Sequence, residues 1–454
     1  MLTQLGVTNF KSWRQIRNMR LSPITGLFGV NSSGKTGILQ FLLMLKQTVE
    51  SADRAAVLEF GDERSLTSLG SFSEIVFNHQ RPGTLEFALN WDRREILTIP
   101  DPLSNRNTLF SGRELSFAGS VTDNGADRLA VSELTYGLSG STFTMSRKGE
   151  LGAQYKLTSD AKDFHFIRTQ GRAWPLPPPV KCYGFPDQVY AYYQNAGFLA
   201  DFQLAFEDLF SRIYYLGPLR EFPQRHYAWK GSEPSDMGRR GERVVDALLA
   251  SRQRGKYISP GPKRHRKTLE ERVAYWLKKL GLIHTFAVES IAEGSNLYQV
   301  LVRKSPSSPK VLITDVGFGV SQVLPVLVLC YYVPEGSTIL LEQPEIHLHP
   351  FAQSGLADVF IDAIRTRNVQ IVLESHSEHL LRRLQRRMAE QKLPSDKAAF
   401  HFCDVRNGGT RLTPLNLDLY GNITNWPKDF FGDGFGEMAA MTRAAIARKR
   451  AGER

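Results

Sequence analysis

The sequence has little cysteine and no long apolar run, and each scarcity excludes a class of protein. Only Cys182, Cys330 and Cys403 occur among 454 residues, far apart from one another. Two of them lie in apolar or strand-like segments, so we expect buried thiols in a reducing cytoplasm rather than disulfides. No apolar stretch is long enough to cross a bilayer, and residues 1–10 lack the apolar core of a targeting segment. We therefore expect a cytoplasmic protein without a membrane partner.

Sustained heptads, internal repeats and a zinc-ligand pattern are also missing, which argues against a long coiled coil, a repeat protein and a zinc site. The apolar content of 42% is ample for a large core, and the length suggests two or three lobes. The net charge of +11 favours phosphate-rich partners such as nucleic acid. A soluble protein with a moderate positive bias explains that charge equally well.

Changes in pattern along the chain predict an α/β fold in three segments. Residues 1–188 begin with a strand, a glycine turn and an amphipathic helix, and continue as an antiparallel β lobe of short alternating runs. Residues 189–285 are interpreted as a helical insertion with a basic stretch. Residues 286–454 alternate apolar strands with helices in α/β fashion. The two outer segments carry the motifs of a nucleotide site.

A phosphate-binding loop lies between an apolar strand and the first helix. Residues 29–36 read Gly-Val-Asn-Ser-Ser-Gly-Lys-Thr and fit the pattern G-x-x-x-x-G-K-[ST] completely. The glycines let the backbone wrap a phosphate, and Lys35 adds charge, while the Thr36 hydroxyl can ligate Mg²⁺. A glycine turn that merely joins a strand to a helix is the weaker interpretation. The residues assigned to ATP and Mg²⁺ here are Gly29, Asn31, Ser32, Ser33, Gly34, Lys35 and Thr36.

Two further strands end in polar residues that would complete such a site. The apolar strand at 337–342 ends in Glu342, whose carboxylate can hold the water shell of Mg²⁺. The apolar strand at 370–374 is followed by His376, which can reach the terminal phosphate or the attacking water. An acidic, solvated strand end and an ordinary packed histidine are the plain alternatives. The spacing of the motifs favours the ligand roles.

A third element is the glycine turn Asp315-Val-Gly317-Phe-Gly319-Val-Ser321, which precedes an apolar helix. A glycine turn that opens a helix presents free N–H groups and can bind an anion. Helix starts with glycine are common, so this turn alone is a weak signal.

Together these residues resemble the ABC-type ATPases of the SMC, recombination-repair and OLD group. Three segments carry the resemblance: Asn9-Phe-Lys-Ser-Trp13, Glu342-Gln-Pro-Glu-Ile-His-Leu-His-Pro350 and Glu374-Ser-His-Ser-Glu378. The segment Tyr215-Leu-Gly-Pro-Leu-Arg220 and the end motif from Gly421 to Phe431 look like a bacterial subfamily of stand-alone ATPases. Several relatives of that subfamily serve in anti-phage systems of the PARIS, Septu and retron types.

The resemblance implies a head-to-head homodimer, or a higher homo-oligomer, with ATP and Mg²⁺ at the shared face. The phosphate loop of one subunit would hold each ATP together with the glycine turn of the other. Gly317 and Gly319 would make that contact, and Ser321 is an alternative because the turn is not a clean Leu-Ser-Gly-Gly-Gln.

The catalytic position departs from the family pattern. Most relatives have a carboxylate directly after the acid at the end of this strand, whereas Gln343 follows Glu342 here. An amide can orient water but cannot take its proton. Either Glu345 substitutes as the base or hydrolysis is slow, and slow hydrolysis is the favoured expectation. The candidate catalytic residues are Gln343, Glu345 and His376.

The favoured function is an ATP-driven switch that controls a separate effector protein, in anti-phage defence by resemblance. The chain ends soon after His376 and leaves no room for the nuclease domain of many OLD relatives, so a nuclease is one candidate for that partner. A DNA-repair or DNA-maintenance ATPase that acts on DNA directly is an alternative. A non-hydrolysing, ATP-bound scaffold is another, because of Gln343.

Two basic clusters bear on the choice between an effector protein and DNA. One spans residues 252–279, and the other consists of Arg382, Arg383, Arg386 and Arg387. Such clusters can neutralise phosphates of nucleic acid without reading its sequence. A solvated helix face, or a contact with an acidic protein, explains them as well.

Overall fold

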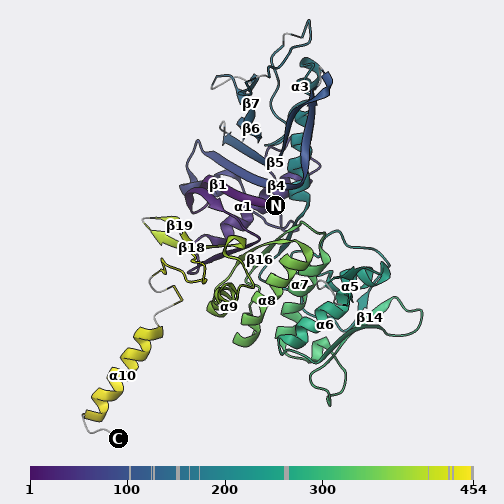
Figure 1. Cartoon of the computed structure of the whole chain (residues 1–454), viewed down its shortest axis with the longest axis vertical. Helices are drawn as coiled ribbons and strands as arrows, with labels where there is room; N and C mark the ends of the chain where they lie inside the picture. The colour runs from purple at the N-terminus through teal and green to yellow at the C-terminus, as the bar shows by residue number, and fades with distance from the viewer. Residues whose placement is uncertain are drawn as a thin grey trace.

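The computed structural model describes residues 1–101, 104–123, 125, 128–149, 154–162, 164–172, 174–259, 265–406, 408–427, 430–431 and 434–450. It has a mixed α/β fold with two large sheets. The antiparallel sheet lies at one end of the molecule, and a lobe of helices lies at the other (Figure 1). The central, mostly parallel sheet lies between them and carries the phosphate loop.

The central sheet has the strand order β19-β18-β3-β17-β16-β9, and only β19 runs antiparallel to its neighbour. Every residue of β3, β16 and β17 is buried, as expected for parallel strands covered on both faces. The carboxyl ends of the parallel strands meet at one edge, where open α/β sheets bind ligands. The strands are β3 (Ile24–Gly29), β9 (Ile213–Leu216), β16 (Thr338–Glu342), β17 (Gln370–Glu374), β18 (Ala398–Arg406) and β19 (Gly409–Leu415).

The second sheet confirms the predicted antiparallel region and extends it to the start of the chain. Its order is β2-β1-β4-β5-β6-β7-β8, with antiparallel pairing throughout. Alternate residues of β4 are buried, because one face packs on the core and the other meets solvent. The strands are β1 (Leu2–Phe10), β2 (Trp13–Arg20), β4 (Thr84–Asp101), β5 (Ser104–Asp123), β6 (Leu129–Leu138), β7 (Ser141–Arg147) and β8 (Tyr155–Ser159).

One hydrophobic core joins the two sheets through α1 (Lys35–Glu50) and α4 (Leu199–Ser211). Phe41 and Leu42 of α1 are fully buried in it, as the predicted apolar face of this helix requires. The helix that follows the phosphate loop is therefore fixed between both sheets, and it holds the loop against the edge of β3.

A second core lies under the helical lobe and beneath the other face of the central sheet. The apolar helix α7 crosses it, and all of its residues from Val320 to Tyr331 are buried. The helices of this lobe and of the sheet's outer face are α5 (Val244–Gln253), α6 (Leu269–Lys279), α7 (Phe318–Tyr332), α8 (Pro350–Arg367) and α9 (Glu378–Ala389). A small antiparallel sheet packs beside them, with strands β10 (Tyr227–Ala228), β13 (Thr285–Ser290), β14 (Leu297–Arg303) and β15 (Val311–Leu312).

The middle segment is less uniform than its interpretation as a helical insertion. The division at 189 and 286 stays a prediction, but β9 comes from this segment and pairs in parallel with β16. The sequence did not show this strand, because four residues are too few to show a strand period. The chain after 286 also begins with an antiparallel hairpin, β13 and β14, rather than with alternating strands and helices.

Helix α6 begins with a capping box at Thr268. The Thr268 side chain accepts a hydrogen bond from the N–H of Glu271, whose carboxylate accepts from the N–H of Thr268. The C-terminal helix α10 (Gly434–Arg450) extends away from the body (Figure 1). The short elements are α2 (Phe72–Ile75), α3 (Asp187–Tyr192), η1 (Phe77–His79), η2 (Ile313–Asp315), η3 (Ser395–Lys397), β11 (Tyr257–Ile258) and β12 (Lys267–Thr268).

Each of the three cysteines is described and is a buried, free thiol. Among the described residues, no helix combines the length and the apolar character that crossing a bilayer requires.

Candidate functional site

The phosphate loop joins β3 to α1, and two of its glycines are required by geometry. Gly29 has φ 141° and Gly34 has φ 79°, both in the region that side chains disfavour. A Cβ at Gly29 would lie 2.1 Å from the carbonyl oxygen of Cys403. A Cβ at Gly34 would lie 2.6 Å from the Ser12 hydroxyl. The loop can therefore be this tight only with glycine at both positions.

Lys35 begins α1 and points back across the loop. Its ammonium group donates to the carbonyls of Gly29 at 3.1 Å and Val30 at 2.6 Å, and it lies 4.0 Å from a carboxylate oxygen of Glu374. Burial lowers the pKa of Lys35, although Glu374 opposes the shift. The side chain is only 3% exposed. A buried cation inside a ring of backbone is the arrangement expected for binding outer phosphates.

The remaining loop residues lie at the mouth of this ring. Asn31 and Ser32 are exposed, and Ser32 has φ 58°. Ser33 is buried, with its hydroxyl 3.4 Å from the Lys35 ammonium. The predicted phosphate-binding residues are thus brought together, in the order that the motif implies.

The turn between β1 and β2, at Ser12 and Trp13, holds the phosphate loop in place. The Trp13 indole N–H donates to the carbonyl of Gly34 at 3.0 Å, and Trp13 is fully buried. The N–H of Thr410 in β19 donates to the carbonyl of Ser12 at 2.9 Å. The turn between β1 and β2 therefore fixes the loop to the outer edge of the central sheet.

Two buried carboxylates lie side by side at the carboxyl ends of β16 and β17. Glu342 and Glu374 are register partners across the parallel pair. The Thr36 hydroxyl donates to Glu374 at 2.7 Å, and the Tyr215 hydroxyl donates to Glu342 at 2.8 Å. Burial raises the pKa of Glu342 to about 7, and it also raises the pKa of Glu374. Two neighbouring buried carboxylates next to a threonine hydroxyl fit a hard divalent cation with oxygen ligands.

These residues therefore fit Mg²⁺ and ATP. The backbone of the loop and Lys35 would hold phosphates, while Thr36, Glu342 and Glu374 would hold the ion or its water shell. Mg²⁺ would neutralise charge on the phosphate oxygens. The negative charge that burial disfavours on Glu342 and Glu374 is then favoured by the cation.

The candidate catalytic residues follow these strand ends directly. Gln343 has φ 44°, and its N–H donates to the carbonyl of Glu374 at 2.9 Å. One oxygen of Glu345 accepts from the Ser375 hydroxyl and from the N–H of His376, each at 2.8 Å. The second oxygen of Glu345 is buried and has no hydrogen-bond partner among the described residues. One oxygen of the Glu345 carboxylate therefore holds the turn after β17, at Ser375 and His376, in place.

His376, whose backbone N–H is bonded to Glu345, is half-buried near the phosphate loop. Burial lowers its pKa, and the charge of Lys35 lowers it further. The imidazole is therefore neutral near pH 7 and can donate or accept a hydrogen bond. Ser377, next in the chain, caps α9 by accepting from the N–H of Leu380.

The glycine turn lies at the start of α7, with Gly317 as its exposed N-cap. The ring of Phe318 packs against Phe222 at 5.6 Å and against His347 at 5.1 Å. Gly319 is half-buried, whereas the Ser321 hydroxyl is buried and donates to the carbonyl of Phe318 at 2.8 Å. Gly317 is thus exposed, as are Asp315 and Phe318, whereas the Ser321 hydroxyl is hydrogen-bonded within its own helix.

Two family models match parts of the chain. The model described as "AAA domain, putative AbiEii toxin, Type IV TA system" matches residues 198–382. The model described as "Protein of unknown function (DUF3696)" matches residues 393–441. No curated protein sequence matches.

Among solved structures, SMC heads are similar in arrangement. The SMC head domain from Thermotoga maritima matches with 13% identity and a TM-score of 0.43, over 91% of this chain and 99% of that one. An SMC head bound to the C-terminal winged-helix domain of ScpA matches with 11% identity and a TM-score of 0.47, over 92% and 98%. The SMC head from Pyrococcus furiosus, with an extended coiled coil and bound to ScpA, gives 10% identity and 0.43, over 92% and 96%.

The phosphate loop with its buried lysine and the paired carboxylates form one candidate nucleotide site. The match to an AAA domain covers both carboxylates, Glu342 and Glu374, but not the loop at residues 29–36. The roles assigned to His376, to the glycine turn and to the catalytic candidates Gln343 and Glu345 stay predictions.

Sequence reasoning missed three residues of the site. Glu374 touches Thr36, Tyr215 touches Glu342, and the guanidinium of Arg220 donates to the carbonyl of Glu342 at 3.1 Å. All three belong to segments that resemble the family, but no role followed from their spacing. The available signal for Glu374 was its position at the end of an apolar strand, the same position that identified Glu342.

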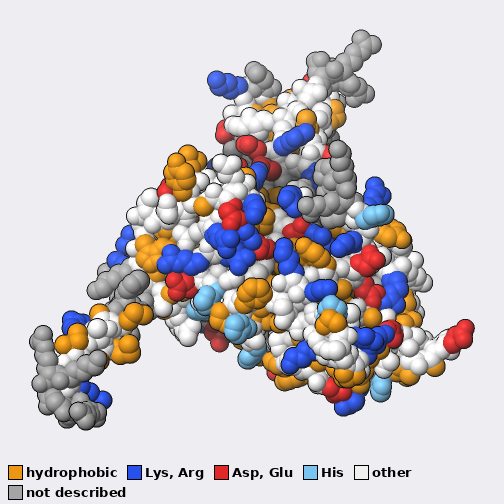
Figure 2. Space-filling model, turned by 60° about the horizontal axis from the view of Figure 1, so that its bottom comes forward, with side chains coloured by type: hydrophobic (Ala, Val, Ile, Leu, Met, Phe, Trp, Pro, Cys, Tyr) orange, Lys and Arg blue, Asp and Glu red, His pale blue; other side chains and the backbone are white. Residues whose placement is uncertain are grey.

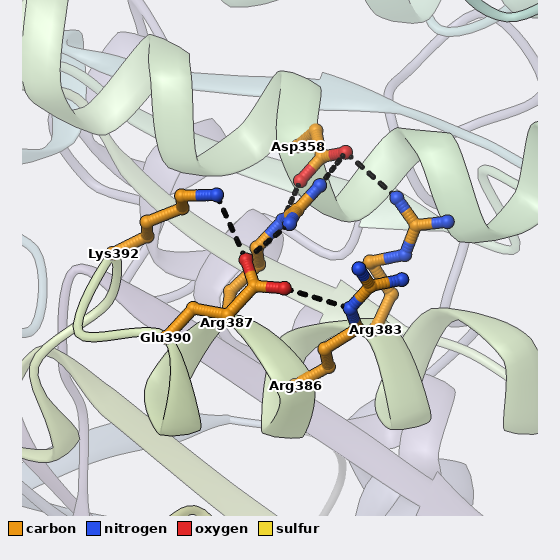
Figure 3. A network of polar contacts seen from close by, with 6 residues as sticks. All are labelled: Asp358, Arg383, Arg386, Arg387, Glu390 and Lys392. Carbon is orange, nitrogen blue, oxygen red and sulfur yellow. Dashed lines mark hydrogen bonds and ion pairs between the residues drawn. The ribbon is translucent and has the colours of Figure 1, made fainter.

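The basic cluster on α9 is neutralised by acidic partners (Figure 3). Asp358 of α8 accepts from Arg383 at 2.9 Å and from two nitrogens of Arg387 at 2.5 and 2.8 Å. Glu390 accepts from Arg386 and Lys392, and also pairs with Arg387. Paired arginines offer little free charge to a phosphate backbone.

The first basic cluster is also partly paired. Arg252 pairs with Glu270, and the buried Arg272 pairs with Asp362. Residues 260–264 of this cluster lie outside the described residues. On the face in Figure 2, Lys and Arg side chains are interspersed with acidic and apolar ones rather than gathered in one stripe.

Proposed function

We propose that this protein is a slowly hydrolysing ATP switch whose ATP-driven dimerisation controls a separate effector protein in bacterial defence. The observation that carries the proposal is the state of the two candidate bases. Gln343 stands where a carboxylate would take the proton of the attacking water, and Glu345 is engaged with Ser375 and His376.

The consequence of this arrangement is a long-lived ATP state. A glutamine amide orients water but accepts no proton. The hydrogen bonds of Glu345 to Ser375 and His376 hold its carboxylate in the strand-to-helix turn. A neutral His376 can still orient a phosphate or water. The site therefore has more groups for binding ATP than for removing a proton from the attacking water. Such a site suits a protein that stays in its ATP-bound state.

The glycine turn supports a shared site between two copies. Gly317 is exposed at the N-terminus of α7, where N–H groups and the helix dipole favour an anion. Phe318 of this turn and Phe222, whose ring packs on it, are 39% and 65% exposed. Large apolar side chains exposed around an anion-binding turn are expected at a face that a second copy covers on binding ATP.

The defence role rests on the family match and the resemblance. The matched family is described by a putative toxin of a type IV toxin–antitoxin system. An effector protein is preferred over DNA as the partner because the arginines of α9 are paired within the chain.

Complementation between two inactive variants tests the shared site. Lys35→Ala removes the phosphate-loop cation. Gly317→Arg blocks the turn, and a Cβ at Gly317 meets no atom within 4 Å, so the isolated subunit tolerates the change. A mixed dimer then has one site with both defects and one intact site. We expect particle mass to double with ATP in wild type, neither variant to dimerise alone, and the mixture to dimerise and regain slow turnover.

Three results would contradict the proposal. Failure of the mixture to recover would place the whole site in one subunit. Brisk turnover by wild type would contradict the long-lived ATP state. Turnover stimulated by DNA, with no mass change on ATP, would favour the DNA-maintenance ATPase.

A further inference from the structure

Arg220 is a buried cation with free donors at the nucleotide edge. It follows β9 by four residues and is 3% exposed. Its Nη2 atom donates a hydrogen bond to the carbonyl of Glu342. Among the described residues, its Nε and Nη1 groups have no hydrogen-bond partner, although both are buried.

The carboxylates near Arg220 are committed elsewhere. Glu342 accepts from Tyr215, and Glu345 accepts from Ser375 and His376. Both carboxylates favour the charged form of Arg220 electrostatically, and burial lowers its pKa only to about 10, so it stays protonated at neutral pH. Buried guanidinium groups normally satisfy their donors with planar acceptors such as carboxylate or phosphate. The open donors therefore call for an anion that is not part of the chain.

The position of Arg220 identifies which anion can reach it. The carboxyl ends of β3, β17, β16 and β9 share one edge, and β3 leads into the phosphate loop. The Nη2 atom of Arg220 binds the end of β16, two strands from β3, which is roughly 10 Å at the usual strand spacing. Lys35 and the Mg²⁺ ligands Thr36, Glu374 and Glu342 lie between. A phosphate chain held at the loop and directed along this edge toward β16 would bring its terminal phosphate to Arg220.

We propose that Arg220 binds the terminal phosphate of ATP and so makes the site distinguish ATP from ADP. The inference rests on the proposed function, because it requires that ATP binds at the phosphate loop. It adds a third cationic group, after Lys35 and Mg²⁺, that only the triphosphate engages. Planar, bidentate recognition is the property that separates arginine from lysine in such a role.

The loop that carries Arg220 also leads to the glycine turn. Phe222, two residues further, packs on Phe318 at the start of α7. The loop in which Arg220 would bind phosphate therefore contacts the exposed turn that the second copy would contact. This places the discrimination between ATP and ADP where it can influence dimerisation.

Binding of a non-hydrolysable ATP analogue and of ADP, each with Mg²⁺, tests the inference on the full chain. The variants are Arg220→Met and Arg220→Lys. The control is Arg240→Met, whose ion pair with Glu221, the residue after Arg220, lies near the surface. We expect Arg220→Met to weaken the analogue about 10- to 100-fold and ADP less than about twofold. Arg220→Lys should recover part of the loss, and Arg240→Met should change neither affinity. Thermal unfolding of each variant reports on the fold.

Each other outcome is decisive. Equal weakening of analogue and ADP, together with a lower unfolding temperature, would make Arg220 a structural brace of the Glu342 strand end and overturn the inference. Unchanged affinities in Arg220→Met would overturn it too, while the proposed function stands. If wild type binds neither nucleotide, the proposed function fails first and the inference with it.

Discussion

Two charged clusters differ in whether their charges are satisfied within the chain. Between α8 and α9, every carboxylate oxygen of Asp358 and Glu390 accepts from an arginine or lysine (Figure 3). At the nucleotide edge, Glu345 has a bare oxygen and Arg220 has two bare nitrogens. Glu342 and Glu374 have hydroxyl partners, and the nearest ammonium, on Lys35, stays 4.0 Å from Glu374.

The pKa shifts of Asp358 and Glu342 differ in direction, in agreement with this contrast. Burial alone would raise the pKa of Asp358, but the hydrogen bonds and charges of Arg387 and Arg383 outweigh it and lower the pKa. Burial raises the pKa of Glu342 to about 7 and outweighs the hydrogen bond from Tyr215 and the charges of Arg220 and Lys11. Charged groups that are fully paired within the chain stabilise the fold. Charged groups that lack such partners at the edge of a sheet are candidates for binding a ligand.

Removing the loop cation should have the largest effect. In Lys35→Ala we expect ATP affinity to fall on the order of 100-fold, because the ammonium contributes charge-assisted hydrogen bonds to the phosphates in a buried ring. Calorimetric titration with ATP and Mg²⁺ measures it, and the fold should tolerate the loss. An affinity within about threefold of wild type would show that the loop does not hold the nucleotide.

Breaking the paired cluster should act on stability and spare the nucleotide. Asp358→Asn removes the carboxylate partner of Arg383 and leaves Arg387 with Glu390 alone, and we expect the free energy of unfolding to fall by about 2 kcal/mol. ATP affinity should stay unchanged, in contrast to Lys35→Ala. Denaturant unfolding and ATP titration of one preparation check both. A stable variant with weakened ATP binding would show that the two clusters are not separate.

The same pair predicts a pH dependence with a definite sign. The pKa of Asp358 is lower in the folded protein than its ordinary value, so its stabilisation is present above about pH 4 and is lost as pH falls through the folded value. The stability difference between wild type and Asp358→Asn should therefore be constant above about pH 5 and shrink at acid pH. A difference that grows on acidification would contradict this assignment.

Local patterns explain what the sequence could predict of this fold. The phosphate loop, the helix after it and the strands ending in Glu342 and Glu374 are each defined by residues within one short window. Glycine spacing and apolar period operate over that range. The charged pair Glu378 and Arg382, four residues apart on α9, is of the same local kind.

Long-range contacts explain what remained hidden. Thr36 and Glu374 meet across 338 positions, and Asp358 meets Arg387 across 29. The strand β9 is only four residues long, and its place beside β16 follows from pairing rather than period. The burial of Arg220 depends on that pairing, so no sequence motif could separate it from a solvent-exposed arginine.

Restoring a carboxylate at the catalytic position should have a smaller effect, on rate alone. Gln343→Glu supplies a base for the attacking water, and we expect turnover to rise about tenfold. Steady-state ATPase activity measures it, with Gln343→Ala as the control that removes the amide without adding a base. No increase would indicate that the free oxygen of Glu345 already takes the proton, and the cluster at the nucleotide edge would then be complete as it stands.

The smallest effect is expected from the exposed arginines of the paired cluster. Arg382 and Arg386 are mostly exposed, and their pairs with Glu378 and Glu390 each contribute about 0.5 kcal/mol or less. Arg382→Ala with Arg386→Ala should leave stability nearly unchanged and should alter DNA affinity less than about twofold, because these charges are already neutralised. DNA titration over a range of salt concentrations decides the point. A salt slope that falls by nearly two units would mean that both arginines leave their carboxylates to neutralise phosphates, and the contrast with the nucleotide edge would then be one of degree.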